Sequence, residues 1–198
     1  EPFVTGIPNP TSLALDAEGR LHVSSRFDGS VYRVGDDGSA APIATDLGVA
    51  CGIAFDPAGV LHVGDRSGTI LRVEHGRTSA LASLPASVAA FHLAFGPDGM
   101  LFVTGPTLGT RDAVYRITPD GEVSVFYEGF GRPQGLAFDS RGRLHVVDAI
   151  AGGGGLFRFE AGASSPEQLI AGGGLIGVAF GPGDVMAVAS PETVYRFA

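Results

Sequence analysis

Two aspartates and one histidine of this sequence are suited to acid–base or cation chemistry. Asp65 and Asp148 each end a Leu-His-Val-x-Asp segment, and His92 begins a His-Leu-Ala-Phe segment. A pair of carboxylates can hold a cation or accept hydrogen bonds from sugar hydroxyls, and a neutral imidazole suits a general base. The competing interpretations are an aspartate that caps a backbone turn and a histidine that only lines a polar surface.

Further polar residues extend this candidate set. Arg26, Arg66 and Arg111 lie in segments that we expect to be loops, and Gln134 directly precedes an apolar strand segment. Loops carried by a rigid scaffold are common places for recognition. We therefore predict ligand contacts at these four residues and at Asp65, His92 and Asp148, with a solvated rim as the alternative for the arginines.

Five similar segments place these residues in an internal repeat. The segments start 40 to 43 residues apart and span residues 12–23, 52–63, 92–103, 135–146 and 177–188. Each contains a short apolar strand, a polar turn and a second strand, and each is followed by a third strand of the type Val-Tyr-Arg-Val. A period near 40 residues is typical of one four-stranded blade of a β-propeller.

The repeat predicts an all-β fold, a single β-propeller domain over residues 1–198 with five four-stranded blades. The expected blades are residues 12–47, 52–86, 92–129, 135–171, and 177–198 together with 1–6. In this arrangement residues 2–6 pair with the last strand and close the ring, which removes exposed sheet edges. The alternative is an excerpt of a six-bladed propeller.

Recurring residues are interpreted as scaffold. His22, His62 and His145 hold one repeat position, which indicates packing between blades rather than a metal cluster. An arginine recurs in every third strand, with its stem covering apolar surface. Cys51 could act as a nucleophile only if a base and positive charge lay beside it. The favoured interpretation is that it is buried as a small apolar residue.

Composition narrows the partners. The net charge is −8, lysine is absent and the arginines are scattered, which excludes a phosphate-binding surface for nucleic acid and argues against an anionic membrane. No apolar run approaches the length of a membrane span.

We expect a monomer. The chain begins without methionine or a signal peptide, so the sequence does not indicate a compartment.

The repeat resembles that of the NHL-type and SMP-30/gluconolactonase/LRE-like propellers over nearly the whole chain. The closest copy runs from Gly135-Leu-Ala-Phe-Asp139 to Leu144-His-Val-Val-Asp148. The resemblance implies a divalent metal held by Glu, Asn and Asp side chains just before the innermost strands. The matching positions hold Thr11, Cys51, Phe91, Gln134 and Ile176. Only Gln134 is a plausible ligand for Ca²⁺ or another divalent cation.

Two functions follow from these observations. The first is a binding or interaction module that takes a small polar molecule, a carbohydrate or a protein segment at its loop-rich channel face, without a firmly assigned cofactor. The alternative is a divalent-metal-dependent lactone hydrolase of the SMP-30/gluconolactonase type, or an inactive fragment of one. In that alternative Asp65, His92, Gln134 and Asp148 surround a shifted cation, and Asp65, His92 and Asp148 are the candidate catalytic residues.

Overall fold

The computed structural model describes residues 2–150 and 152–197 as five antiparallel β-sheets. We call the sheets blades 1 to 5 in chain order. The chain divides into two compact units, Glu1–Leu93 and Ala94–Ala198. Helical structure in the described segments is limited to the 3-10 turn η1, Pro182–Asp184. None of these residues belongs to a helix that is long and apolar enough to cross a membrane.

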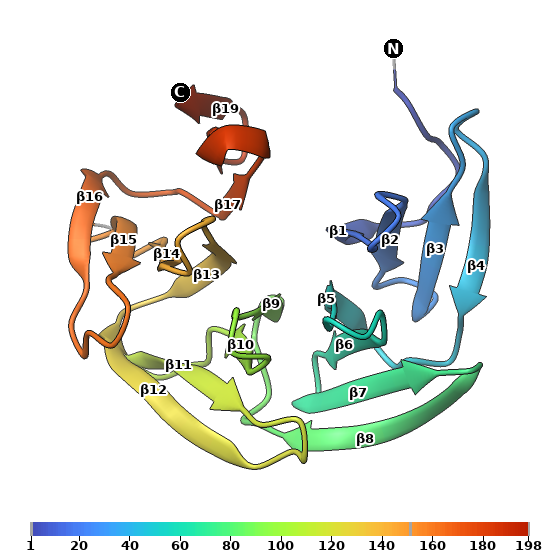
Figure 1. The fold of residues 1–198 in the computed structure, drawn as a ribbon, viewed down its shortest axis with the longest axis horizontal. Helices are drawn as coiled ribbons and strands as arrows, with labels where there is room; N and C mark the ends of the chain where they lie inside the picture. Colours follow the sequence, from blue (N-terminus) through green and yellow to red (C-terminus); the bar gives the residue numbers. More distant parts are fainter. Residues whose placement is uncertain (1, 151, 198) are drawn as a thin grey trace. The chain divides into compact units, whose positions relative to one another are not determined.

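The first unit contains blades 1 and 2, in which strands consecutive in the chain lie side by side (Figure 1). Blade 1 is made of β1 (Pro10–Leu15), β2 (Leu21–Ser25), β3 (Ser30–Val34) and β4 (Ala40–Ala44). Blade 2 is made of β5 (Ala50–Phe55), β6 (Leu61–Asp65), β7 (Thr69–Glu74) and β8 (Arg77–Ser83).

The second unit contains the other three blades, although β9 begins two residues before its boundary. Blade 3 is made of β9 (His92–Phe95), β10 (Leu101–Thr104), β11 (Asp112–Ile117) and β12 (Val123–Phe130). Blade 4 is made of β13 (Pro133–Phe138), β14 (Leu144–Asp148), β15 (Gly155–Phe159) and β16 (Glu167–Ala171). Blade 5 has three strands, β17 (Gly177–Phe180), β18 (Met186–Ala189) and β19 (Val194–Phe197).

The turn between the first two strands of a blade follows directly from its sequence. In blade 2 the Asp56 carboxylate accepts hydrogen bonds from the backbone N–H groups of Ala58 (2.9 Å) and Val60 (2.8 Å). Gly59 completes this turn at φ +82°, a conformation that favours glycine. Blades 1 and 4 have the same Asp-x-x-Gly sequence at this turn. The order of the strands in each sheet confirms the predicted consecutive blades of the β-propeller class.

Glycines let the first strands of successive blades approach closely. A Cβ atom on Gly135 would lie 2.7 Å from the Gly177 Cα atom of blade 5. A Cβ atom on Gly52 would meet the carbonyl oxygen of Phe91 and, at 2.8 Å, a methyl group of Leu93. The inner strands therefore pack backbone against backbone, which no larger residue permits.

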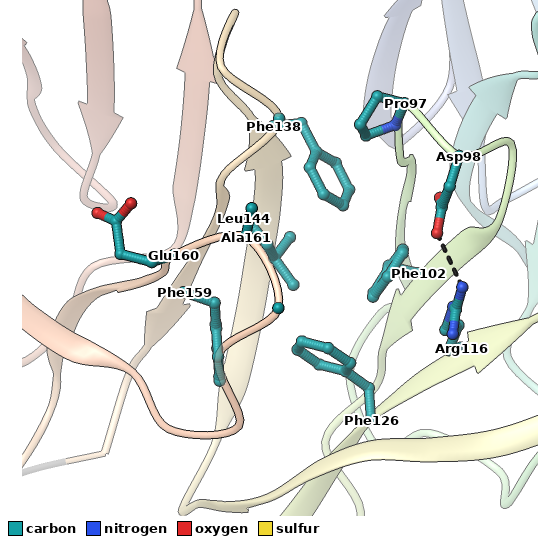
Figure 2. A pocket seen from close by; sticks show the side chains of 12 residues that line it. Pro97, Asp98, Phe102, Arg116, Phe126, Phe138, Leu144, Phe159, Glu160 and Ala161 are labelled. Carbon is teal, nitrogen blue, oxygen red and sulfur yellow. Dashed lines mark hydrogen bonds and ion pairs between the residues drawn. The ribbon is translucent and has the colours of Figure 1, made fainter.

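Each unit buries its own apolar clusters between blades. In the first unit Val31 of blade 1 packs with Ile53 and Val63 of blade 2. In the second unit Phe102 of blade 3 packs with Leu136 and Phe159 of blade 4, and Figure 2 shows part of this aromatic cluster. Because apolar residues alternate along the strands, both blades present apolar side chains where they pack together.

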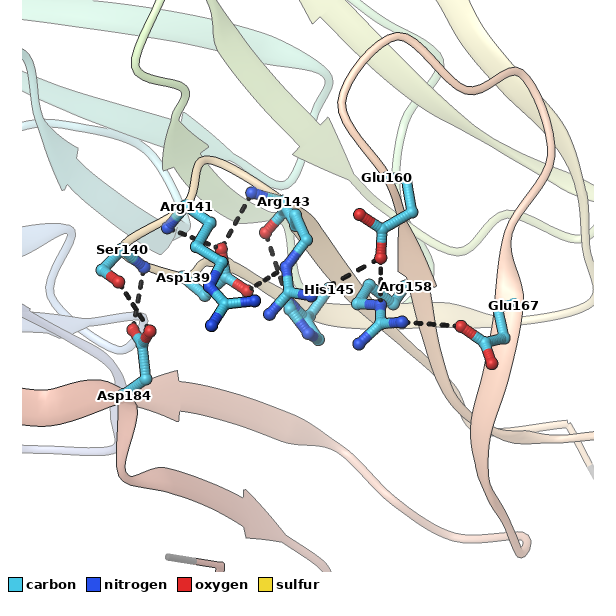
Figure 3. Close-up of polar contacts among 9 residues, drawn as sticks. All are labelled: Asp139, Ser140, Arg141, Arg143, His145, Arg158, Glu160, Glu167 and Asp184. Carbon is cyan, nitrogen blue, oxygen red and sulfur yellow. Dashed lines mark hydrogen bonds and ion pairs between the residues drawn. The ribbon is translucent and has the colours of Figure 1, made fainter.

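The recurring histidines are packing residues, as predicted. The Nδ1 atom of His145 lies 3.1 Å from the carbonyl oxygen of Arg143, and its ring packs on Phe180 of blade 5 with 4.7 Å between ring centroids. Arg143 Nε also donates to Asp139 at 2.7 Å (Figure 3). His22 is held in the same way, with its Nδ1 atom 3.0 Å from the Arg20 carbonyl oxygen and its ring on Phe55.

The recurring arginines extend this network along the third strands. Arg158 Nε lies 2.9 Å from Glu160, and Arg158 Nη2 lies 2.7 Å from Glu167 (Figure 3). Arg72 pairs with Glu74 in the same manner at 3.0 Å. Arg158 thus reaches carboxylates in the turn after β15 and on β16, whereas the partner of Arg72 ends the same strand β7.

One part of the predicted architecture is corrected. Residues 2–6 form no strand, and the sheet of blade 5 contains three strands. The Phe3 carbonyl oxygen instead lies against Gly38 in the turn between β3 and β4, and the Pro8 carbonyl oxygen accepts a hydrogen bond from Ser25. Gly6 adopts φ +83°, and this conformation interrupts an extended segment.

Some apolar residues of blades 1 and 5 are exposed, although the residues at the same repeat positions in other blades are buried. Leu13 of blade 1 is 65% exposed, whereas Ile53 at the same repeat position is 3% exposed. Val194 of blade 5 is 69% exposed, whereas Val31 is fully buried. Burial of these positions therefore depends on the adjacent blade.

The close approach at Gly135 predicts a specific sensitivity to added side-chain volume. We expect Gly135→Ala to lower the free energy of unfolding by about 1–3 kcal/mol, because its Cβ meets backbone that has no rotamer to change. Gly172→Ala is the matched control, since a Cβ there has open space. Chemical denaturation measures both variants, and equal stabilities would contradict the packing described.

The buried histidines predict a pH-dependent stability. Burial lowers the pKa of His62 below its ordinary value of 6.5. This effect is larger than that of the hydrogen bond to Val60 and the nearby Asp56, which both raise the pKa. The unfolded state therefore binds the proton first, and the free energy of unfolding falls as the pH drops below 6.5. We expect His62→Phe, which installs the residue of blade 3, to make this slope shallower by up to about 1.4 kcal/mol per pH unit.

The control for this measurement is His75→Asn, at an exposed turn histidine with φ +51° that asparagine tolerates. Denaturation midpoints across this pH range should separate the two variants. A His62→Phe slope equal to that of the unsubstituted protein would contradict the burial argument.

Candidate functional site

The candidate residues gather where the second strand of a blade ends beside the start of its first strand. The backbone N–H of Arg26 donates to the Asn9 carbonyl oxygen at 3.3 Å, and that of Arg66 donates to the Val49 carbonyl oxygen at 3.1 Å. In blade 4 the N–H of Ala149 makes the equivalent bond to Arg132, at 3.0 Å. Each blade therefore brings its entering segment and its second-to-third strand loop to one end.

Hydroxyl groups fix the residues at the predicted metal positions. Ser24 Oγ donates to the carbonyl oxygen of Cys51, and Thr104 Oγ1 donates to the carbonyl oxygen of Gln134. Both bonds join one blade to the first strand of the next within the same unit. Sequence reasoning missed these hydroxyls, although a serine or threonine after the apolar residues of the second strand was their visible signal.

Asp65 serves its own blade as a backbone acceptor. Its Oδ1 atom accepts the N–H of Val49 at 2.7 Å, and its Oδ2 atom accepts the Ser67 hydroxyl. Gly48 lies so close that a Cβ atom there would be 2.7 Å from the carboxylate. The carboxylate thus holds the segment that enters β5.

Asp148 plays the same part in blade 4 and is buried. Its carboxylate accepts the N–H groups of Arg132 at 2.7 Å, Gly131 at 3.0 Å and Ile150 at 3.3 Å. For both aspartates the turn-capping interpretation is the one that the geometry supports. Turning either carboxylate toward a cation would leave backbone donors without an acceptor.

A third aspartate, Asp112, has a similar role. Asp112 is buried at the start of β11 and accepts the N–H of Thr107 at 3.0 Å and its hydroxyl at 2.6 Å. It orders the loop between β10 and β11. Arg111, the adjacent candidate ligand residue, is exposed on that loop.

In the first unit, Arg26, Asp65 and Arg66 lie within electrostatic range of Cys51. Burial raises the pKa of the Cys51 thiol; Arg26, a Phe91 backbone hydrogen bond and Arg66 oppose this rise, whereas Asp65 reinforces it. Because the pKa is raised overall and the side chain is fully buried, the thiol stays protonated at neutral pH. Cys51 is therefore a packing residue, and both guanidinium groups lie within electrostatic range of it.

Arg66 is held in place by the loop that precedes blade 3. Its Nε atom donates to the carbonyl oxygen of Ser87 at 3.3 Å, and its Nη2 atom donates to that of Val88 at 3.4 Å. Both bonds go to neutral carbonyl groups, so the positive charge remains available to a ligand. Arg66 is the most firmly positioned cation of the candidate set.

The other predicted residues are placed as follows. Gln134 is buried in blade 4, where its neighbour Pro133 pairs with Asp148 across the sheet. His92 is half-buried at the start of β9 and directly follows Phe91, the residue that hydrogen-bonds Cys51. The structure thus places Arg26, Asp65 and Arg66 within electrostatic range of Cys51 in one unit, and Gln134 beside the strand position that pairs with Asp148 in the other.

The donor set does not fit the divalent-metal site that the resemblance implies. The matching positions supply a buried thiol, two apolar side chains, a hydroxyl and one amide, whereas Ca²⁺ takes six to eight oxygen ligands. Over residues 2–150 and 152–197, no three His, Cys, Asp or Glu side chains gather as a cation site requires.

Comparisons with known proteins support the fold. No protein-family model matches the chain, and no curated protein matches its sequence. Among solved structures, a protein described as a putative gluconolactonase has a TM-score of 0.81 at 17% identity, over 100% of this chain and 77% of its own.

Two further structures are similar. XC5397 from Xanthomonas campestris, described as a gluconolactonase, has a TM-score of 0.79 at 19% identity, over 98% of this chain and 74% of its own. The calcium-binding protein regucalcin from Agrobacterium tumefaciens has a TM-score of 0.73 at 16% identity, over 98% and 72%. The chain therefore has the β-propeller fold of gluconolactonase- and regucalcin-like proteins.

Proposed function

We propose that this protein is a hydrolase of small oxygen-rich cyclic esters, of the gluconolactonase type, that works without the family's divalent metal. The observation that carries the proposal is that Arg26 and Arg66 hold the same position, directly after the second strands of blades 1 and 2, and that Arg66 is held there by two carbonyl groups. The shared fold with two structures described as gluconolactonases favours a small-molecule substrate over a protein segment.

The chemistry that these residues can perform is electrostatic. When water adds to a lactone carbonyl, negative charge develops on the carbonyl oxygen, and guanidinium groups stabilise such an oxyanion. Arg66, already anchored by two carbonyl groups, provides this charge without reorganisation. The ring-opened product is a hydroxy acid, whose carboxylate the same arginines bind.

We assign the proton transfer to His92. Its imidazole accepts a proton from the attacking water as the new carbon–oxygen bond forms. The tetrahedral intermediate then collapses by breaking the ring carbon–oxygen bond, and the imidazolium returns the proton to the leaving alkoxide. Oxygen, protons and charge balance, and no further reactant is needed.

A second candidate function is a binding module that takes the intact sugar or sugar acid without turnover. The observation that favours it is the use of the Asp65 and Asp148 carboxylates by backbone donors. The same arginines would then serve recognition only. The two candidates differ in whether ring opening accompanies binding.

The arginines give the direct test of turnover. We expect the protein to accelerate the opening of five- and six-membered sugar lactones above the buffer rate, equally with and without a chelator. Arg66→Gln should lower kcat/KM about tenfold to a thousandfold, because one oxyanion donor is lost. The control Arg77→Gln changes an exposed arginine of β8 and should retain full activity.

Calorimetry with the corresponding sugar acids separates the two candidates. Absence of turnover together with binding that Arg66→Gln weakens would leave the binding module. Turnover abolished by chelator would contradict the metal-independent chemistry. Turnover unchanged in Arg66→Gln, with an unchanged melting temperature, would remove the arginines from the mechanism.

Asp148 tests the metal argument separately. We expect Asp148→Ala to lower the free energy of unfolding by about 1–3 kcal/mol, because the backbone donors that it binds lose their acceptor. Added Ca²⁺ should leave the melting temperature unchanged, as binding to the folded state alone would raise it. The control is the exposed Asp120→Ala. A Ca²⁺-dependent rise that Asp148→Ala removes would contradict the capping role.

A further inference from the structure

A cavity of about 320 Å³ lies between blades 3 and 4, at the strand ends opposite to the candidate site. The turns that frame it are those between β9 and β10 and between β15 and β16, and they contribute Pro97, Asp98, Glu160 and Ala161. Its volume lies at the lower end of the range of small-molecule sites. The candidate site uses none of these residues.

Phenylalanine side chains make most of the wall. Figure 2 shows the rings of Phe102, Phe126, Phe138 and Phe159 around one opening, with Leu144 behind them. Phe102 packs edge-on against Phe126 and Phe138, each with 5.1 Å between ring centroids, and Phe126 packs against Phe159 at 5.0 Å. Another aromatic ring inserted among them finds the edge-to-face partners that such rings favour.

The cleft at the corresponding place between blades 1 and 2 is more polar. It is lined by Asp16, Glu18, Arg20, His22 and Arg33 together with apolar residues such as Ile43 and Phe55. Blade 3 has Gly96, Met100 and Phe102 where blade 1 has Asp16, Arg20 and His22. Replacement of these three residues removes one carboxylate, one guanidinium group and one imidazole, while Asp98 and Arg116 stand where blade 1 has Glu18 and Arg33.

Charge at the rim is balanced. Arg116 Nη2 lies 2.8 Å from Asp98, and Glu160 lies 2.9 Å from Arg158 (Figures 2 and 3). Each carboxylate of the rim thus faces a guanidinium group. A charged ligand would lose hydration in the apolar wall without gaining an unpaired counter-charge.

We propose that this cavity binds a small uncharged aromatic molecule, of one ring or two fused rings, independently of the arginine site at the other strand ends. The ring is recognised by the four phenylalanines, and the paired charges at the rim reject cationic and anionic analogues. The ligand class follows from the wall chemistry and from the departure of blade 3 from the repeat.

Indole fluorescence provides the test, because the chain contains no tryptophan. We expect saturable binding of indole to one site of the full chain, competed by phenol but not by benzylamine or benzoate. Ala161→Phe, at an exposed position on the cavity rim, should weaken indole binding at least about tenfold by filling the space. Ala58→Phe, at an exposed position in the polar cleft between blades 1 and 2, is the matched control and should bind indole normally.

Phe102→His supplies a second variant, since blades 1, 2 and 4 fold with histidine at this position. It should weaken indole binding while circular dichroism shows the β-sheet spectrum retained. Absence of saturable binding, equal affinity in Ala161→Phe, loss in Ala58→Phe, or competition by benzylamine or benzoate as strong as that by phenol would each overturn the proposal.

Discussion

The close approach of first strands from successive blades is the constraint on which the molecule depends. Backbone meets backbone at Gly52 and Gly135, and a hydroxyl of the preceding blade binds the carbonyl group of the residue just before each glycine. This contact leaves little room for side chains at the inner strands. The loops at one strand end and the clefts between blades at the other have more room, and the two proposed sites lie there.

At the loop end, carboxylates and guanidinium groups have separate tasks. Asp65, Asp112 and Asp148 hold backbone N–H groups of their own blades and so give each loop one conformation. In the proposed function, the arginines that follow the second strands of blades 1 and 2 carry the charge that the substrate meets. On that proposal the backbone holds the carboxylates and the free charge is cationic, so the protein's net negative charge is a poor guide to the ligand.

At the other strand ends, blades 3 and 4 share the backbone arrangement of the repeat but differ in the side chains that it carries. Asp139, Arg143 and His145 make a polar network in blade 4, and the same three positions of blade 3 hold apolar residues. In blade 4 the Asp139 carboxylate accepts the backbone N–H groups of the turn, whereas in blade 3 Asp98 accepts the N–H of Met100. Both blades therefore close the turn, and their second and third strands pair without a register shift. A repeat scaffold can therefore vary the lining of one cleft without altering the fold around it.

The sequence alone determined the strands, their order and the five-blade repeat, because alternating apolar residues and Asp-x-x-Gly turns act locally. It also identified the histidines as packing residues and the aspartates as candidate turn caps. Tertiary structure decided what depends on distant neighbours: residues 2–6 lie against blade 1 instead of completing blade 5, and Asp65 binds the N–H of Val49. It also decided burial, since Val31 and Val194 share one repeat position, yet only Val31 has an adjacent blade packed on it. A residue's place in the apolar alternation follows from its own strand, whereas its burial and its hydrogen-bond partners depend on the segment that packs against it.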